Sequence, residues 1–311
     1  EKIVAFVTEI DEAREWALAD GCIEDLDYII FNLSSKGAKN IFGNPPSPLL
    51  MGVVNVTPDS FYDGGNHSDV KSAISRAHRL IAAGADIIDI GGESSKPGAI
   101  PVTAKEEIER VIPVIKEVVG FGVPVSVDTK KSAVMEAAII AGASIVNDIT
   151  ALSGDSRSIG LLKETGTPVI LMHMQGSPVN MQNEPYYEFA PLDIFEYLRQ
   201  RITICLEAGI SKSNLIVDPG IGFGKNLNHN LAILHRLSIF HGLGVPIAIG
   251  VSRKSLIAAL SEDEPSEERL PGSLAMAIWA YNQAVQILRV HDVAETKQAL
   301  EIYKAVVDDN F

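Results

Sequence analysis

Short apolar runs alternate with amphipathic stretches from residue 49 to the end of the chain. Each run is rich in Val, Ile and Leu and ends in a polar residue or glycine, as a buried β-strand does. The predicted strands are Leu49–Val56, Asp86–Gly92, Val123–Thr129, Ser144–Ile149, Val169–Met174, Leu215–Gly220, Ile247–Ser252 and Gln286–Asp292. The stretches between them carry apolar residues at helical spacing, as Val70, Ile74, Ala77 and Ile81 do. The pattern therefore predicts eight consecutive strand–helix units.

Eight such units in one chain favour a closed parallel barrel. A strand that is apolar throughout must be covered on both faces, and the crossover helices of a parallel sheet supply that cover. The sequence therefore predicts an α/β fold, the (β/α)8 TIM barrel. An open doubly wound sheet is the alternative, but it would place a glycine-rich dinucleotide turn after the first strand. The residues there are Asn55-Val56-Thr57-Pro58, which do not form such a turn.

The first 48 residues precede these units. We expect them to form a small accessory segment of strand, helix and strand, joined to the barrel by the stiff linker Asn44-Pro45-Pro46-Ser47-Pro48. A plug beneath the barrel is the position we expect for this segment. The chain is thereby divided into an accessory segment with its linker, residues 1–48, and a barrel domain, residues 49–311.

The composition argues against several classes of protein. The 311 residues include 26 Lys and Arg against 40 Asp and Glu, and the formal charge of −14 repels nucleic acid and anionic membranes. The chain has no run of about 18 apolar residues, and its first residues lack the pattern of a signal peptide. Cys22 and Cys205 stand far apart without metal-ligand spacing, which fits a reducing compartment. We therefore expect a cytoplasmic protein with no nucleic-acid or membrane partner.

Polar residues stand where the predicted strands end, and in a parallel barrel all strands end at one rim. Asp128, Asn147 and Asp218 would point acceptors and donors into one mouth, as a flat heterocycle with an amidine-like edge requires. The basic residues at this rim are Lys96, Lys225, Arg253, Lys254, Arg289 and His291. Taken singly, each of these polar residues is explained as well by helix capping or a solvated surface charge as by a functional role. Together, on an acidic protein, the basic residues predict a phosphate or pyrophosphate ligand.

The histidines do not have the spacing of a zinc site. His173 and His291 come singly, so a metal cage built by the protein is not expected. Mg²⁺ needs few protein ligands when phosphates supply the rest, so Asn55 alone can complete its coordination beside pyrophosphate. Two glycine-rich loops, 61–65 and 218–226, are predicted to be mobile over the mouth.

The strand-end motifs form an ordered series along the chain. They are Met51-Gly52-Val53-Val54-Asn55-Val56-Thr57-Pro58-Asp59-Ser60-Phe61, Asp89-Ile90-Gly91-Gly92-Glu93-Ser94, Ser126-Val127-Asp128-Thr129, Asn147-Asp148-Ile149, Leu171-Met172-His173-Met174-Gln175-Gly176, Asp218-Pro219-Gly220, Ser252-Arg253-Lys254-Ser255 and Arg289-Val290-His291-Asp292. The series resembles that of the dihydropteroate synthase family over residues 49–308. The resemblance implies a transferase of folate biosynthesis that joins 6-hydroxymethyl-7,8-dihydropterin pyrophosphate to p-aminobenzoate and is a sulfonamide target. It also implies Mg²⁺ as cofactor and a homodimer.

The resemblance also implies a role for individual residues. The pterin would be bound by Asp128, Asn147, Met172, Asp218, Phe223 and Lys254. Pyrophosphate would be bound by Asn55, Arg289 and His291, and Asn55 would also hold Mg²⁺. The p-aminobenzoate site would use Phe61, Ser95, Lys96, Pro97, Phe223 and Ser255. Catalysis would fall to Asp128, Asp218, Lys254, Arg289 and His291, which would stabilise a cationic pterin and a departing anion.

One loop departs from the family pattern. Ser95-Lys96-Pro97-Gly98 stands where the family commonly has Thr-Arg before Pro-Gly, and Lys lacks the planar fork of Arg.

Three other functions stay open. The first is a pterin-dependent methyltransferase on the same barrel, which would need neither Mg²⁺ nor pyrophosphate. The second is a Schiff-base aldolase that uses Lys254, and the third is a non-catalytic pterin-binding scaffold.

Overall fold

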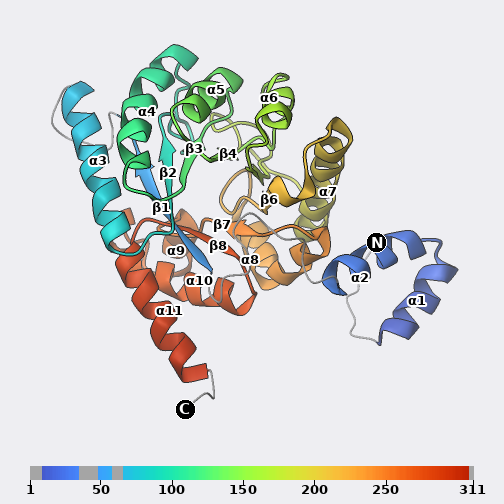
Figure 1. Cartoon of the computed structure of the whole chain (residues 1–311). Helices are drawn as coiled ribbons and strands as arrows, with labels where there is room; N and C mark the ends of the chain where they lie inside the picture. Colours follow the sequence, from blue (N-terminus) through green and yellow to red (C-terminus); the bar gives the residue numbers. More distant parts are fainter. Residues whose placement is uncertain (1–8, 35–47, 58–65, 308–311) are drawn as a thin grey trace.

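The computed structural model describes residues 9–34, 48–57 and 66–307. Its strands are β1 (Leu49–Asn55), β2 (Ile87–Gly91), β3 (Val125–Asp128), β4 (Ile145–Asp148), β5 (Val169–Met172), β6 (Leu215–Asp218), β7 (Ala248–Ile249) and β8 (Ile287–Val290). They lie in the order β6-β5-β4-β3-β2-β1-β8-β7, and every pair is parallel. A bridge between Val217 and Ile247 joins β6 to the segment leading into β7 and closes the ring. The predicted TIM barrel is confirmed (Figure 1).

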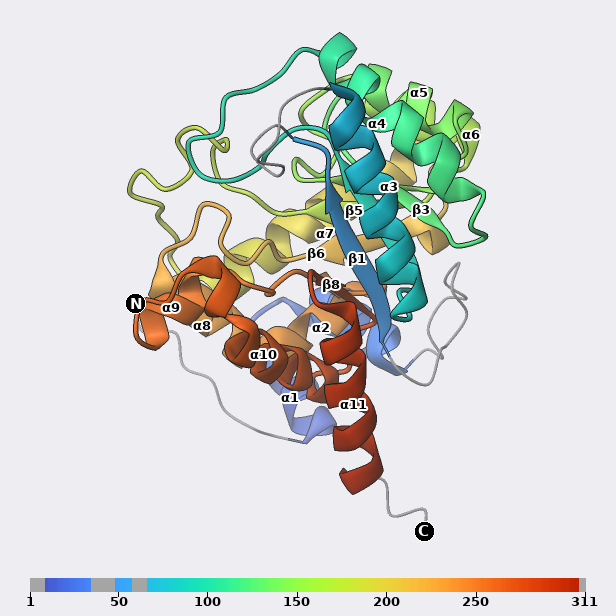
Figure 2. The same ribbon diagram turned by 90° about the vertical axis from the view of Figure 1, so that its left-hand side faces the viewer.

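Helices follow the strands and cover the outside of the barrel (Figures 1 and 2). They are α3 (Asn66–Ala82), α4 (Ala104–Val119), α5 (Ser132–Ile140), α6 (Ser158–Thr165), α7 (Ala190–Ala208), α8 (Leu227–His235), α9 (Ser255–Leu260), α10 (Leu270–Asn282) and α11 (Val293–Val307), with short 3-10 turns at η2 (Lys212–Asn214), η3 (Leu237–Leu243) and η4 (Ser266–Glu268). Within the described ranges, no helix combines the length and apolar character needed to cross a membrane.

Two groups of apolar side chains hold the barrel together. Outward-facing strand residues such as Ile88 and Leu171 pack beneath the helices in a large outer core. Inside the ring, a second core consists of Met51, Ile87, Ile145, Ile170, Ile216, Ala248 and Ile287. Because side chains alternate along a strand, the next inward-facing residue of each strand lies two positions further toward its carboxyl end. The functional side chains begin at that level.

All eight predicted strands are present, and each is shorter than the sequence predicts. The largest difference is at β7, which is Ala248–Ile249 where the pattern predicts Ile247–Ser252. Ile149 and Val251 are buried although they lie beyond the last residue of their strands. The apolar pattern therefore reports burial, which continues past the last hydrogen bond of the ladder.

The described part of the first 48 residues forms two helices, α1 (Ile10–Ala19) and α2 (Ile23–Ser34). The prediction of a single helix is wrong, because the described residues 9–34 form two. The strands predicted on either side would fall on residues outside this range. Asn32 of α2 donates from Nδ2 to the carbonyl of Gly242 at 2.8 Å. Its Oδ1 accepts from Lys212 Nζ at 2.9 Å. Since Lys212 and Gly242 precede β6 and β7, α2 lies at the amino-terminal end of the barrel, opposite the strand ends.

Candidate active site

Five strands place a side chain two positions beyond the inner core, at the level where the ring becomes polar. These residues are Asp89, Asn147, Met172, Asp218 and Arg289. Asp128 ends β3 beside Gly91 of β2 in the parallel ladder. A Cβ at Gly91 would lie 3.4 Å from the Cβ of Asp128, which is ordinary van der Waals contact, so the two positions are direct neighbours on the ring. The structure thus brings the predicted pterin residues to one end of the ring, as the strand-end rule predicts.

Arg289 lies between two carboxylates. Its Nε donates to Asp89 Oδ2 at 2.7 Å, and its Nη2 donates to Asp128 Oδ2 at 2.8 Å. Asp89 also accepts a hydrogen bond from Asn147 Nδ2 at 3.2 Å. The Nη1 of Arg289 makes no hydrogen bond to a described residue, and 23% of the side chain is exposed. Residues from β2, β3, β4 and β8 therefore form one network that still has a donor available to a ligand.

The charges of this network are set by burial and by each other. Burial raises the pKa of Asp128 to about 7, with Arg289 opposing the rise and Asp89 adding to it. Burial lowers the pKa of Arg289, but the Asp89 and Asp128 carboxylates outweigh this effect and the pKa is raised. A carboxyl group that titrates near neutral pH beside a permanent cation is a common feature of functional sites.

A second pair of charges lies at the ends of β6 and β7. Asp218 accepts from the Gly220 N–H at 2.7 Å, and burial raises the pKa of its carboxyl group. Lys254 donates to the carbonyl of Ile221, and its Nζ lies 4.3 Å from the centroid of the Phe223 ring. Burial lowers the pKa of Lys254 to about 8, although Asp218 opposes this change. The predicted pterin residues Asp218, Phe223 and Lys254 are thus brought together.

The loop after β6 is held in place by buried contacts. Gly220 has a φ of 69°, and a Cβ there would lie 1.9 Å from the carbonyl oxygen of His173. Lys225 is 2% exposed and donates to the Phe223 carbonyl at 2.8 Å. Its Nζ also lies 3.0 Å from His173 Nδ1, and burial together with this cation lowers the pKa of His173 to about 2. Lys225 therefore belongs to the framework of this loop and not to an exposed basic rim.

A third group contains the residues predicted to bind pyrophosphate. His291 Nδ1 lies 3.1 Å from Ser252 Oγ. Burial and the neighbouring cations, Arg289 first among them, lower the pKa of His291 to about 3, so the imidazole is neutral at pH 7. The side chain of Asn55, at the end of the adjacent strand β1, makes no hydrogen bond to a described residue. Arg253 is already paired with Asp292, at 2.8 and 2.5 Å.

The predicted p-aminobenzoate residues lie on two loops and one helix. Ser95, Lys96 and Pro97 belong to the β2–α4 loop, in which the last two are exposed. The Gly98 N–H donates to the Pro178 carbonyl at 2.9 Å, so this loop touches the one after β5. Phe223 is half-buried and Ser255 begins α9. Phe61 and the loop 61–65 lie outside the described residues.

Asp89 belongs to a strand-end motif, but no role in the site is predicted for it from the sequence. It stands inside β2, two positions before the strand ends, so a search of strand ends alone does not select it. The signal that could have found it is a single acidic residue in the apolar run Ile87-Ile88-Asp89-Ile90. A charged side chain at the inward position of a buried strand needs a partner of opposite charge.

Known proteins are similar to this chain in sequence and in fold. The family model for pterin-binding enzymes matches residues 51–291. The dihydropteroate synthase of Escherichia coli K12 is 48% identical over 261 residues, which are 84% of this chain and 92% of that protein. This chain belongs to the dihydropteroate synthase family. The predicted family and its transferase class are confirmed.

Solved structures agree with this assignment. The Xanthomonas albilineans dihydropteroate synthase with 4-aminobenzoic acid superposes with a TM-score of 0.80 and 43% identity, covering 85% of this chain and 94% of that one. The Yersinia pestis dihydropteroate synthase in a sulfonamide drug complex superposes with a TM-score of 0.79 and 46% identity, covering 84% and 94%. Both are similar to this chain over almost their whole length.

Proposed function

We propose that the chain condenses 6-hydroxymethyl-7,8-dihydropterin pyrophosphate with p-aminobenzoate to give 7,8-dihydropteroate and pyrophosphate. The observation that carries this proposal is Arg289, held between Asp89 and Asp128 at the mouth of a barrel of this family. The reaction develops positive charge on the pterin and negative charge on the leaving group. A site that presents carboxylates and a guanidinium side by side stabilises both charges.

The pterin ring is bound at the polar level of the barrel. Asp128, Asn147 and Asp218 supply the acceptors and donors for its edge. Met172, 4% exposed, contacts the ring from β5 and Phe223 from the β6 loop. Positive charge that develops on the pterin lowers the pKa of a neighbouring carboxyl group, so the reaction favours the ionised form of Asp128. The carboxylate then stabilises the positive charge as the bond to pyrophosphate breaks.

The leaving pyrophosphate is bound by Asn55, Arg289 and His291. The unbonded Nη1 of Arg289 donates to a phosphate oxygen, and neutral His291 donates through the nitrogen that does not face Ser252. Lys254 adds an ammonium group from the segment after β7, the strand paired with β8. Together these donors stabilise negative charge that grows only as the bond breaks.

The residues present also fit Mg²⁺. In the described ranges, no three His, Cys, Asp or Glu side chains are grouped to hold a metal ion, so a complete protein cage is not the arrangement to test. The amide oxygen of Asn55 is a hard donor without a hydrogen-bond partner among the described residues, and Mg²⁺ takes such a donor together with phosphate oxygens and water. When bound, Mg²⁺ neutralises charge on the departing pyrophosphate.

The second substrate is bound beside Phe61, Ser95, Lys96, Pro97, Phe223 and Ser255. Its amine attacks the pterin methylene carbon, so a C–N bond forms while the C–O bond to pyrophosphate breaks. The nitrogen then loses a proton to water. An aniline is already unprotonated at pH 7, so the site needs no strong general base. Sulfonamides, which carry the same aniline, are proposed to occupy this site.

Product formation tests the proposal directly. Dihydropteroate is measured from both substrates, with and without Mg²⁺, in the wild type and in Asp128→Asn. Mg²⁺-dependent product that falls at least a hundredfold in the variant is the expected result, on the order of a lost charge interaction in a desolvated site. Tight pterin binding with no product and no affinity for pyrophosphate would instead favour the methyltransferase.

We also propose a cytoplasmic homodimer. The free thiols of Cys22 and Cys205 support a reducing compartment. Light scattering of the purified full chain checks the oligomeric state, and cell fractionation checks the location.

A further inference from the structure

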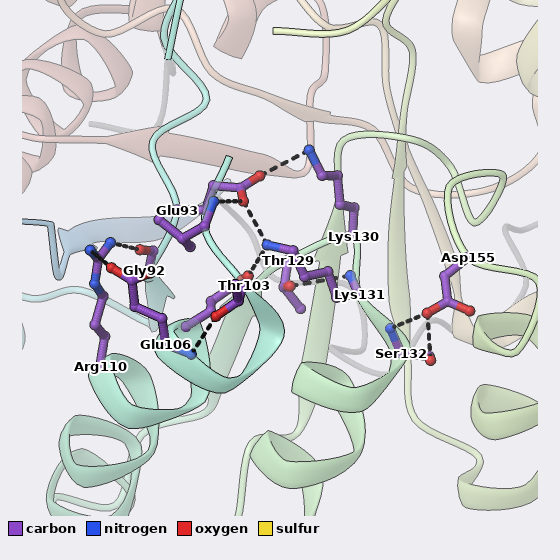
Figure 3. A network of polar contacts seen from close by, with 12 residues as sticks. Gly92, Glu93, Thr103, Glu106, Arg110, Thr129, Lys130, Lys131, Ser132 and Asp155 are labelled. Carbon is purple, nitrogen blue, oxygen red and sulfur yellow. Dashed lines mark hydrogen bonds and ion pairs between the residues drawn. The ribbon is translucent and has the colours of Figure 1, made fainter. Parts of the chain in front are cut away.

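A group of charged side chains lies behind the β2–α4 loop, which carries Ser95, Lys96 and Pro97. Glu93 stands at the start of this loop, with 11% of its side chain exposed. Its Oε2 accepts from Lys131 Nζ at 2.6 Å, and its Oε1 pairs with Lys130 Nζ at 2.9 Å. Lys131 Nζ also donates at 2.5 Å to Glu107 of α4, whose side chain is 1% exposed. Figure 3 shows Glu93 reaching across to both lysines of the β3–α5 loop.

The same carboxylate joins the two ends of the loop. Glu93 Oε2 accepts from the Val102 N–H at 2.9 Å, nine positions further along the chain. The residues between these two include Ser95, Lys96 and Pro97, three of the six residues proposed to contact p-aminobenzoate. Gly92, just before the loop, is held by Arg110 Nη1, which donates to its carbonyl at 2.7 Å (Figure 3). One side chain therefore fixes where the loop leaves the barrel and where it returns.

The lysines stand on a segment that is itself anchored. Lys131 follows Asp128 by three residues, and its N–H donates to Thr129 Oγ1 at 3.3 Å. The next residue, Ser132, donates from N and from Oγ to Asp155 Oδ2 at 3.0 and 2.6 Å. The ion pair thus connects the p-aminobenzoate loop to the strand end that presents Asp128 to the pterin.

Glu93 and Lys131 keep their charges at neutral pH. Burial raises the pKa of Glu93, but its bonds to Lys131, Lys130 and Val102 outweigh burial, and the net pKa is lowered. Burial lowers the pKa of Lys131, but Glu107 and Glu93 reverse the direction. Buried charges without a partner are costly, so the network persists only while each member is paired.

We propose that Glu93 is a positioning residue for p-aminobenzoate. Through Lys131 and Val102 it sets the β2–α4 loop at a fixed distance from the Asp128 strand end, so that the second substrate meets the bound pterin. This assignment rests on the proposed function. It predicts that Glu93 affects the second substrate and not the first, because no bond of Glu93 reaches the pterin residues.

The test is the Glu93→Gln variant of the full chain. The amide can still accept from the Val102 N–H, but both ion pairs are lost. The KM for p-aminobenzoate should rise about tenfold, the size of one lost charge-assisted bond, while the KM for the dihydropterin pyrophosphate stays within about twofold. Amide hydrogen exchange of residues 94–101 should become faster than in the wild type.

Two further variants make the result specific. Lys131→Arg keeps the positive charge that pairs with Glu93 and should retain most of the wild-type affinity for p-aminobenzoate, whereas Lys131→Met would leave Glu107 buried without its partner and is avoided. Glu109→Gln is the matched control, because Glu109 lies on α4, the helix that also carries Glu107. Glu109 pairs only loosely with Lys105, at 3.9 Å, with the two side chains 66% and 87% exposed. This control should change neither KM nor loop exchange.

Two outcomes would overturn the assignment. One is a Glu93→Gln protein that melts at a lower temperature but keeps both KM values and the wild-type exchange of residues 94–101. The other is an equal rise in both KM values, which would mean a general disturbance of the mouth. An inactive wild type would contradict the proposed function. Because hydrogen exchange needs no turnover, the exchange of residues 94–101 would still show whether Glu93 holds the β2–α4 loop.

Discussion

Replacing Asp89 by Asn tests whether the network around Arg289 is required for activity. The change keeps the shape of the side chain and removes its negative charge. Asp89 has 0% of its side chain exposed, so bulk water does not reach Arg289 from this side to compensate for the lost negative charge. After the change, Asp128 is the only carboxylate in hydrogen-bond contact with Arg289, and Arg289 can turn toward it and away from the pyrophosphate position.

The magnitude follows from the contacts of Asp89. Its Oδ2 accepts one bond from Arg289 at 2.7 Å and one from Asn147 at 3.2 Å, while its Oδ1 has no partner among the described residues. A hydrogen bond to a charged group contributes about 1.5–3 kcal/mol. The amide oxygen of Asn, in the place of Oδ2, can accept both bonds, but it carries no charge, and the NH2 group takes the buried position of the unpartnered Oδ1. We therefore expect a loss of about 2–3 kcal/mol, or about 30- to 150-fold in kcat/KM for the dihydropterin pyrophosphate.

Steady-state kinetics with each substrate varied in turn is the assay, together with thermal melting. Asp86→Asn is the matched control, because Asp86 lies just before the same strand at its other end and accepts from the Leu50 N–H at 2.8 Å. It should lower stability and leave kcat/KM unchanged. If Asp89→Asn stays within threefold of the wild type while it melts at a lower temperature, Asp89 only stabilises the fold and the reasoning is refuted.

Three further predictions concern single residues of the mouth. The kcat/KM for the dihydropterin pyrophosphate should fall as the pH drops below about 7, because the raised pKa of Asp128 then leaves its carboxyl group protonated, and a pH profile of Asp128→Asn should lack this limb. Asn55→Ala should raise the Mg²⁺ concentration for half-maximal rate about tenfold, measured by Mg²⁺ titration, with no change in pterin binding. Gly220→Ala should destabilise the protein by more than about 2 kcal/mol in urea unfolding, because its Cβ would clash with the His173 carbonyl.

Much of the fold and of the site was predictable because both depend on local alternation. Apolar runs separated by helical patterns were sufficient for the barrel, and parallel strands must end at one rim. Asp128, Asn147 and Asp218 were found for that reason, and the structure places them at the same end of the ring. Strand ends were less predictable, since buried residues such as Val251 continue the apolar pattern beyond the hydrogen-bonded ladder.

Which polar residue contacts which was decided by the tertiary structure. Arg289 lies 161 positions from Asp128 and 200 from Asp89, and only closure of the barrel brings β8 beside β1 and near β2 and β3. Lys225 and Lys254 both stand between a strand and the following helix, yet the first is buried in a loop framework and the second lies over the Phe223 ring. The sequence by itself determined the barrel, the rim and the residue types there. Pairing, burial and the resulting pKa values came from packing between segments far apart in the chain, which no local pattern encodes.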